Sequence, residues 1–188
     1  YKNPFLGEYA PGVLKAGGTE NINHQLYFRM ADYMAKTAAM LGFPEKAKAY
    51  RSLSDDILKE FILLYWDEKT HSFQKGNGGN LETEQILAVA FDMIPGKDAS
   101  PVDPHYLAVT SNTAEQNRQS CMAVVAASIQ SNSNRIGTGI YGLHFLFNLL
   151  DEYGYADLAY SVATGLENPS WGNILLQGGT TLQESWGG

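Results

Sequence analysis

Apolar residues recur at spacings of three and four along most of this chain, which is the pattern of helices that bury one face. Turn-forming residues divide the pattern into six segments, at about 23–41, 44–65, 81–93, 114–129, 140–153 and 156–166. Gly42 and Pro44 leave only a short turn between the first two segments, so these helices should lie antiparallel as a hairpin. The sequence has almost no pattern that is typical of β-strands. The chain is therefore predicted to be all-α, with three successive helical hairpins.

The first predicted helix has one face on which apolar residues gather. Its members are Leu26, Met30, Tyr33, Met34, Thr37 and Leu41. Long loops rich in Gly, Asn and aromatic residues follow the second, fourth and sixth helices. Because long irregular loops on a helical scaffold tend to carry function, a site is expected among them.

Composition excludes several classes of function. With 13 Lys and Arg against 20 Asp and Glu, the 188-residue chain has a net charge of −7 and a pI near 5.0. That balance lacks the positive surface that binds nucleic acid, so no nucleic-acid partner is expected. No apolar run approaches the roughly 18 residues that span a membrane. The single cysteine, Cys121, cannot form an internal disulfide, and its apolar surroundings favour a buried structural thiol.

No metal or cofactor site is expected from the sequence. The chain has the histidines His24, His71, His105 and His144. Their spacing is not that of the ligands of a metal site. The glycine-rich stretch 76–80 lacks the Lys and Ser or Thr of a phosphate loop. Glu82 and Glu84 follow it at a predicted helix N-terminus, which stabilises carboxylates whether or not they touch a substrate. For both glutamates, a structural role is favoured over contact with a substrate.

The two ends of the chain indicate a fragment of a larger protein. Tyr1 is not an initiator Met and no signal peptide follows it, while Gly188 comes directly after a dense motif. Three hairpins also do not close a ring of helices by themselves. The localisation and the oligomeric state are therefore left open.

The last twenty residues hold the densest group of chemically useful side chains. Trp171 and Trp186 flank Glu184 in a Gly-rich segment that has almost no other charge. Aromatic faces stack on the C–H faces of sugar rings, and a carboxylate in apolar surroundings has a pKa closer to the working pH. From composition alone, the alternative that Glu184 is a surface residue near a frayed end is favoured.

A resemblance to a known family changes that weighting. The segments 168–172 (Asn-Pro-Ser-Trp-Gly) and 177–186 (Gln-Gly-Gly-Thr-Thr-Leu-Gln-Glu-Ser-Trp) resemble the signature of the bacterial α-L-rhamnosidases of glycoside hydrolase family 78. Three further segments resemble stretches of that family in the same order, and they are 66–73, 136–146 and 154–160. Together these stretches cover most of residues 19–188.

The resemblance implies a fold and a mechanism. It implies an (α/α)6 toroid of the six-hairpin glycosidase type, of which this chain supplies about three hairpins, with residues 1–188 as part of one catalytic domain. It also implies inverting hydrolysis of terminal α-L-rhamnosyl bonds in a glycoside or oligosaccharide substrate, with Glu184 as the general base that activates water. The general acid would lie in an earlier acidic segment, and this chain has no counterpart to it.

Four residues are expected to bind the sugar, and they are Trp171, Trp186, Glu8 and Tyr9. The chain departs from the family pattern at several positions. Gln183 stands where Trp is usual, Arg135 where His is common, and Glu8 and Tyr9 where an Asp-Trp pair is typical. These departures put the exact sugar in doubt more than the hydrolase class.

Two alternatives stay open. One is a six-hairpin hydrolase for another sugar, such as a glucoamylase-like or unsaturated-uronide hydrolase. The other is a helical toroid that binds carbohydrate without catalysis.

Overall fold

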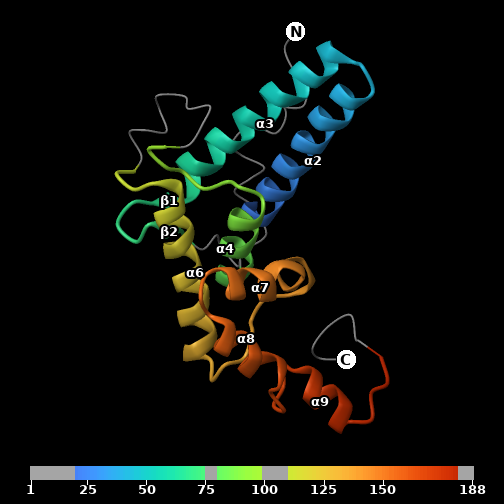
Figure 1. The fold of residues 1–188 in the computed structure, drawn as a ribbon, viewed down its shortest axis with the longest axis vertical. Coiled ribbons are helices and arrows are strands. Elements are labelled where there is room, and N and C mark those ends of the chain that lie inside the picture. The colour runs from blue at the N-terminus through green and yellow to red at the C-terminus, as the bar shows by residue number, and fades with distance from the viewer. Residues whose placement is uncertain (1–19, 75–79, 99–109, 182–188) are drawn as a thin grey trace. The chain divides into compact units, whose positions relative to one another are not determined.

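The computed structural model of the 188-residue chain describes residues 20–74, 80–98 and 110–181 (Figure 1). Helices dominate these residues, and their bounds are α2 (Glu20–Met40), α3 (Pro44–Tyr65), α4 (Leu81–Ala90), α6 (Ala114–Ser131), α7 (Ile140–Glu152), α8 (Ala156–Ala163) and α9 (Trp171–Leu176). One short antiparallel hairpin joins β1 (Trp66–Asp67) to β2 (Ser72–Phe73). The all-α prediction is confirmed.

The six predicted helices are all present, with ends that differ by a few residues. The largest differences are three residues, at the start of α2 and at the ends of α4 and α8. Helix α4 stops at Ala90 because Asp92 takes a left-handed conformation (φ 59°) and the Met93 N–H donates to the Ala88 carbonyl. Helix α9 and the β1–β2 hairpin were not predicted from the sequence. The described residues form two compact units, residues 20–65 with 74 and residues 66–73 with 80–98 and 110–181.

The first unit is the α2–α3 hairpin. Gly42 has φ of +75°, as predicted for a helix C-terminus, and the Phe43 N–H donates to the Ala38 carbonyl at 2.8 Å. Pro44 is then the first residue of α3. An ion pair of Asp32 on α2 with Arg51 on α3 (2.9 Å) also joins the two helices.

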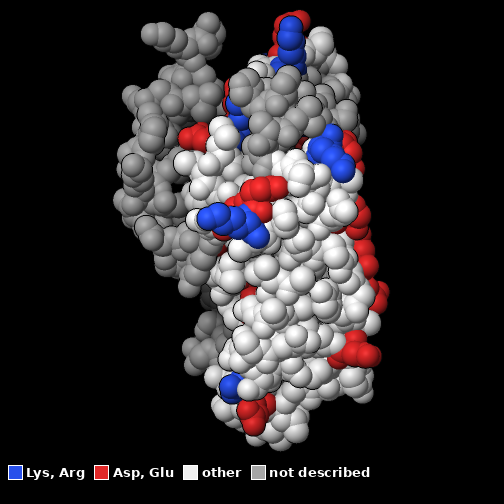
Figure 2. All heavy atoms as spheres, turned by 90° about the vertical axis from the view of Figure 1, so that its left-hand side faces the viewer, with Lys and Arg blue, Asp and Glu red and all other residues white. Residues whose placement is uncertain are grey.

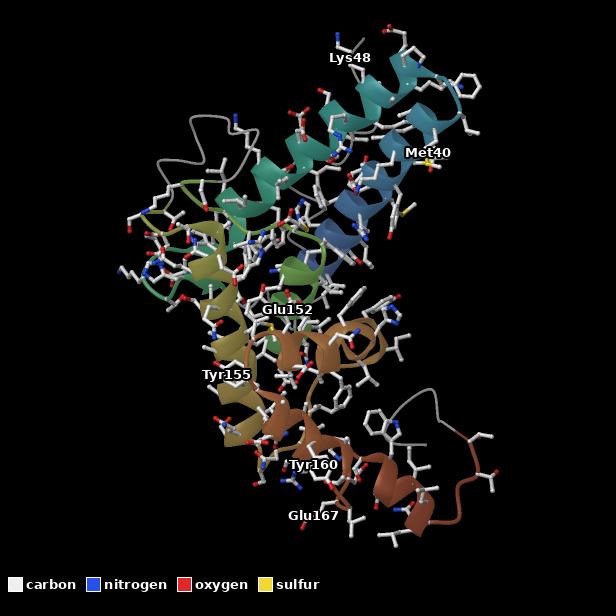
Figure 3. All side chains as sticks on the ribbon, in the orientation of Figure 1. Met40, Lys48, Glu152, Tyr155, Tyr160 and Glu167 are labelled. Atoms are coloured by element: carbon white, nitrogen blue, oxygen red, sulfur yellow. The ribbon has the colours of Figure 1, made fainter. Side chains whose placement is uncertain are left out.

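The packed face of α2 is not the apolar face that the sequence indicates. Phe28 and the small residues Ala31, Ala35 and Ala38 are buried, whereas Met30 is 65% exposed. Alanines let two helix backbones approach closely, so they form the contact face although they are less hydrophobic. Tyr33, Met34 and Leu41 are exposed as well, and Met40 is 87% exposed at the end of the helix (Figure 3).

The second unit is built around α4, which packs against both α6 and α7 (Figure 1). The largest fully buried apolar side chains of this unit are Phe73, Ile86, Leu87, Met93, Met122, Ile129, Leu146 and Leu150. Gln85 ties the β hairpin to α4, because its side chain accepts from the Phe73 N–H (3.0 Å) and donates to the Phe73 carbonyl (2.7 Å). Cys121 is fully buried on α6, and burial raises the pKa of its thiol to about 12. The predicted structural thiol is confirmed.

On the face drawn in Figure 2, Lys and Arg stand apart from one another among Asp, Glu and uncharged residues. Within the described ranges, no helix has both the length and the hydrophobicity that crossing a membrane requires.

Candidate active-site segment

One predicted site residue, Trp171, lies in the part of the chain that the structure describes. The others fall outside the described residues, and they are Glu184, Trp186, Glu8 and Tyr9. The described residues include the segment that leads to the Glu184 motif and the elements that hold this segment.

Trp171 is the first residue of α9, and its ring packs on an aromatic residue of α7. The Ser170 hydroxyl caps α9 by accepting a hydrogen bond from the Asn173 N–H at 2.9 Å. The Trp171 and Phe147 rings lie 5.4 Å apart between centroids, with 38° between their planes. Such pairs stabilise each other beyond the area that they bury. Trp171 is half-buried at the start of α9.

Glycines fold the motif into a tight shape at both ends of α9. A Cβ on Gly172 would lie 2.4 Å from the Gly165 carbonyl oxygen and 2.7 Å from Leu166 Cδ2, so only glycine fits there. At the other end Gly178 has φ of +84°, and the Gly179 N–H donates to the Ile174 carbonyl at 2.9 Å. The glycines of this motif are therefore required by the backbone path into residues 180–181.

A second polar cluster surrounds Glu82, and sequence reasoning missed it. Glu82 is 4% exposed; its Oε1 accepts from Ser128 Oγ of α6 at 2.8 Å. Its Oε2 accepts from the N–H groups of Gly137 (2.7 Å) and Thr138 (3.0 Å), in the loop before α7. The carboxylate thus joins three segments of the second unit.

The neighbours of Glu82 reinforce the same connection. Asn80 caps α4 by accepting from the Thr83 N–H, and Asn80 Nδ2 donates to the Gly137 carbonyl at 2.5 Å. The hydroxyls of Thr83 and Thr138 lie 2.6 Å apart. The six residues of this Glu82 network are Asn80, Glu82, Thr83, Ser128, Gly137 and Thr138. The run of polar residues at 82–85 was its one sequence signal, but such a run is also typical of an exposed helix start.

Glu68 organises the turn between β1 and β2. Its carboxylate accepts from Trp66 Nε1 at 3.1 Å and from the Ser111 N–H at 3.1 Å. Burial alone would raise the pKa of Glu68, but these hydrogen bonds outweigh it and hold the pKa below its usual value. Trp66 packs edge-on against Phe73, with ring centroids 5.1 Å apart.

A search of the described residues finds no group of three or more His, Cys, Asp and Glu side chains that could hold a metal ion.

Comparison with solved structures shows the fold. The described chain matches an α-L-rhamnosidase from Streptomyces avermitilis, solved with L-rhamnose, at a TM-score of 0.69, with 21% identity over 92% of this chain and 14% of that one. It matches an α-L-rhamnosidase from Dictyoglumus thermophilum at a TM-score of 0.65, with 23% identity over 85% of this chain and 16% of that one. These likenesses agree with the predicted six-hairpin fold, of which this chain is a part.

Sequence comparison points the same way. An α-L-rhamnosidase of Formosa agariphila is 27% identical over 97% of this chain, and one of an Alteromonas species is 27% identical over 88%. The chain spans only 17% and 16% of the lengths of these two relatives. The family model that describes the bacterial α-L-rhamnosidase six-hairpin glycosidase domain matches residues 7–188 of this chain. The chain therefore belongs to the family of bacterial α-L-rhamnosidase six-hairpin glycosidase domains.

Proposed function

We propose that this chain forms part of the catalytic domain of an α-L-rhamnosidase, an enzyme that hydrolyses terminal α-L-rhamnosyl bonds. The observation that carries the proposal is the family match over residues 7–188, which includes the Thr-Thr-Leu-Gln-Glu segment at 180–184. The curated relatives that support it are α-L-rhamnosidases.

The reaction we propose is a single inverting displacement. Glu184 takes a proton from a water molecule, whose oxygen attacks the anomeric carbon from the face opposite the leaving group. A general acid donates a proton to the glycosidic oxygen as the bond from that oxygen to the anomeric carbon breaks. Two carboxyl groups roughly 6.5–9.5 Å apart leave room for the water. We place the acid in a segment that precedes this chain in the complete protein.

The remaining residues of the site have supporting roles in this proposal. Trp171, Trp186, Glu8 and Tyr9 contact the sugar. For Trp171 the support is its half-buried ring, which Phe147 holds from α7. Thr180 and Thr181 are exposed and precede Glu184 closely, so their hydroxyls are suited to orient its carboxylate by hydrogen bonds.

The test is a panel of nitrophenyl glycosides assayed with the complete protein encoded by the gene. Turnover of the α-L-rhamnoside is expected, and proton NMR of the first-formed sugar should show the inverted, β anomer. With Glu184→Ala, azide should partly restore turnover and give a glycosyl azide of inverted configuration, because a small anion can replace the activated water. Turnover of another glycoside without the rhamnoside would overturn the proposed substrate. Retention of configuration would overturn the mechanism.

A further inference from the structure

Helix α7 begins without the side-chain cap that usually fixes a helix N-terminus. Its N-cap residue is Gly139, which makes no side-chain hydrogen bond to the first turn. Something else must therefore set where this helix starts. The contacts at that point come from the first turn of α4, through the Glu82 network.

The connection between the two helix starts is close and polar. Glu82 receives the N–H groups of Gly137 and Thr138 on a single carboxylate oxygen, and Glu82 is almost fully buried. A Cβ on Gly142, in the first turn of α7, would lie 2.1 Å from Thr138 Oγ1 and 3.3 Å from Thr83 Cα. The first turn of α7 thus packs directly on these residues, with no space for a shift toward them.

Helix α7 in turn carries the aromatic residue on which Trp171 packs. Phe147 lies seven residues after Ile140, about 10 Å along the helix at 1.5 Å per residue. A helix moves as a rigid element, so a change in how α7 starts is transmitted to the Phe147 ring. We infer that Glu82 is a positioning residue, whose carboxylate fixes the backbone at Gly137 and Thr138 and thereby sets the Phe147–Trp171 pair. The inference rests on the proposed function where it takes Trp171 to contact the sugar.

The hydrogen-bond donors and acceptors of the Glu82 network predict which substitutions at position 82 should preserve the network. Three donors converge on two carboxylate oxygens. A glutamine at position 82 can accept both N–H groups with its carbonyl oxygen and donate its amide to Ser128, whose hydroxyl can turn to accept. Alanine removes every bond. Aspartate is one methylene shorter and cannot reach all three donors from the same backbone position.

The experiment uses the complete protein with Glu82→Ala, Glu82→Gln and Glu82→Asp. Glu152→Ala is the matched control, because Glu152 is exposed at the end of α7 and takes no part in the hydrogen bonds of the network. Two readouts are taken below the melting temperature of every variant: hydrogen exchange at the Gly137 and Thr138 amides, and kcat and KM on a nitrophenyl α-L-rhamnoside.

Glu82→Ala should speed exchange at these two amides by at least about tenfold, as expected for loss of a buried partner. It should raise KM about tenfold while kcat changes less than about threefold, since the sugar contact is displaced and the base is not. Glu82→Gln should restore both readouts to within about threefold, and Glu152→Ala should match the wild type. If Glu82→Ala does not fold, Glu82→Asp should show the same changes at smaller size.

Other results would overturn the inference. One is a lowered melting temperature with unchanged amide exchange and unchanged KM in both Glu82→Ala and Glu82→Asp. Another is Glu82→Gln behaving like Glu82→Ala, which would mean that position 82 needs the charge and not the geometry. If the wild-type protein does not hydrolyse the rhamnoside, the proposed function fails separately, and amide exchange still decides whether Glu82 holds the loop.

Discussion

Gly172→Ala should loosen α9 and disturb the neighbouring Trp171. The added methyl group would lie 2.4 Å from the Gly165 carbonyl oxygen, whereas ordinary contacts begin near 3.4 Å, so the backbone must move by about 1 Å. The nearest atom belongs to the backbone and cannot turn away as a flexible side chain could. Insertions of this kind into packed sites cost about 1–3 kcal/mol, and we expect about 2 kcal/mol here.

The assay for Gly172→Ala is amide hydrogen exchange in α9, because a short helix near the end of a unit can open without global unfolding. About 2 kcal/mol corresponds to exchange roughly thirtyfold faster at the Ile174 amide, which bonds to Ser170 at the start of α9, and at the Gly179 amide, which bonds to Ile174 after its end. Gly139→Ala is the matched control: its Cβ would meet nothing within 4 Å, and its φ of −89° suits any residue. Unchanged exchange in Gly172→Ala, or equal changes in both variants, would mean that the methyl group at residue 172 does not loosen α9 through this close contact.

Two further predictions concern buried titratable groups. Burial raises the pKa of Asp32, but hydrogen bonds from Lys36 and Arg51 outweigh it, so the pKa in the folded protein lies below its unfolded value. The Asp32 carboxylate therefore stabilises the fold above about pH 4, and this stabilisation is lost as the pH falls. The difference in melting temperature between wild type and Asp32→Asn should shrink in acid. A difference that stays constant with pH would contradict this prediction. Cys121, with a pKa of about 12, should resist alkylation at about pH 8 until the protein unfolds, and labelling of the native protein at the rate of a free thiol would contradict its burial.

The positions of the helices could be predicted from the sequence because the helix ends have characteristic residues. Gly42 and Pro44 mark the α2–α3 turn, and Gly154, with φ of +85°, separates α7 from α8. The packing face of α2 was not readable, because the helix has apolar residues on one side and alanines on the other. The periodicity of a sequence identifies the most hydrophobic face of a helix. Two helices that approach closely, however, favour small residues at their contact.

The candidate site residues stay a prediction. The motif around Trp171 was singled out from its residues, and the structure adds the Phe147 ring that contacts Trp171. The role of Glu82 could not be found, because a Glu in the first turn of a helix usually faces water. Its burial depends on Gly137 and Thr138, 55 and 56 residues further along the chain, which only the folded structure brings together.

We propose that Glu184 is the general base of an inverting rhamnoside hydrolysis. The most direct measurement is the kcat and KM of Glu184→Gln in the complete protein, on a nitrophenyl α-L-rhamnoside, with the melting temperature checked in parallel. We expect kcat to fall by at least about a hundredfold, since a general base contributes 10²–10⁴-fold, while KM stays within a few-fold and the melting temperature is unchanged. Near-full activity in Glu184→Gln, or a loss explained by unfolding alone, would contradict it.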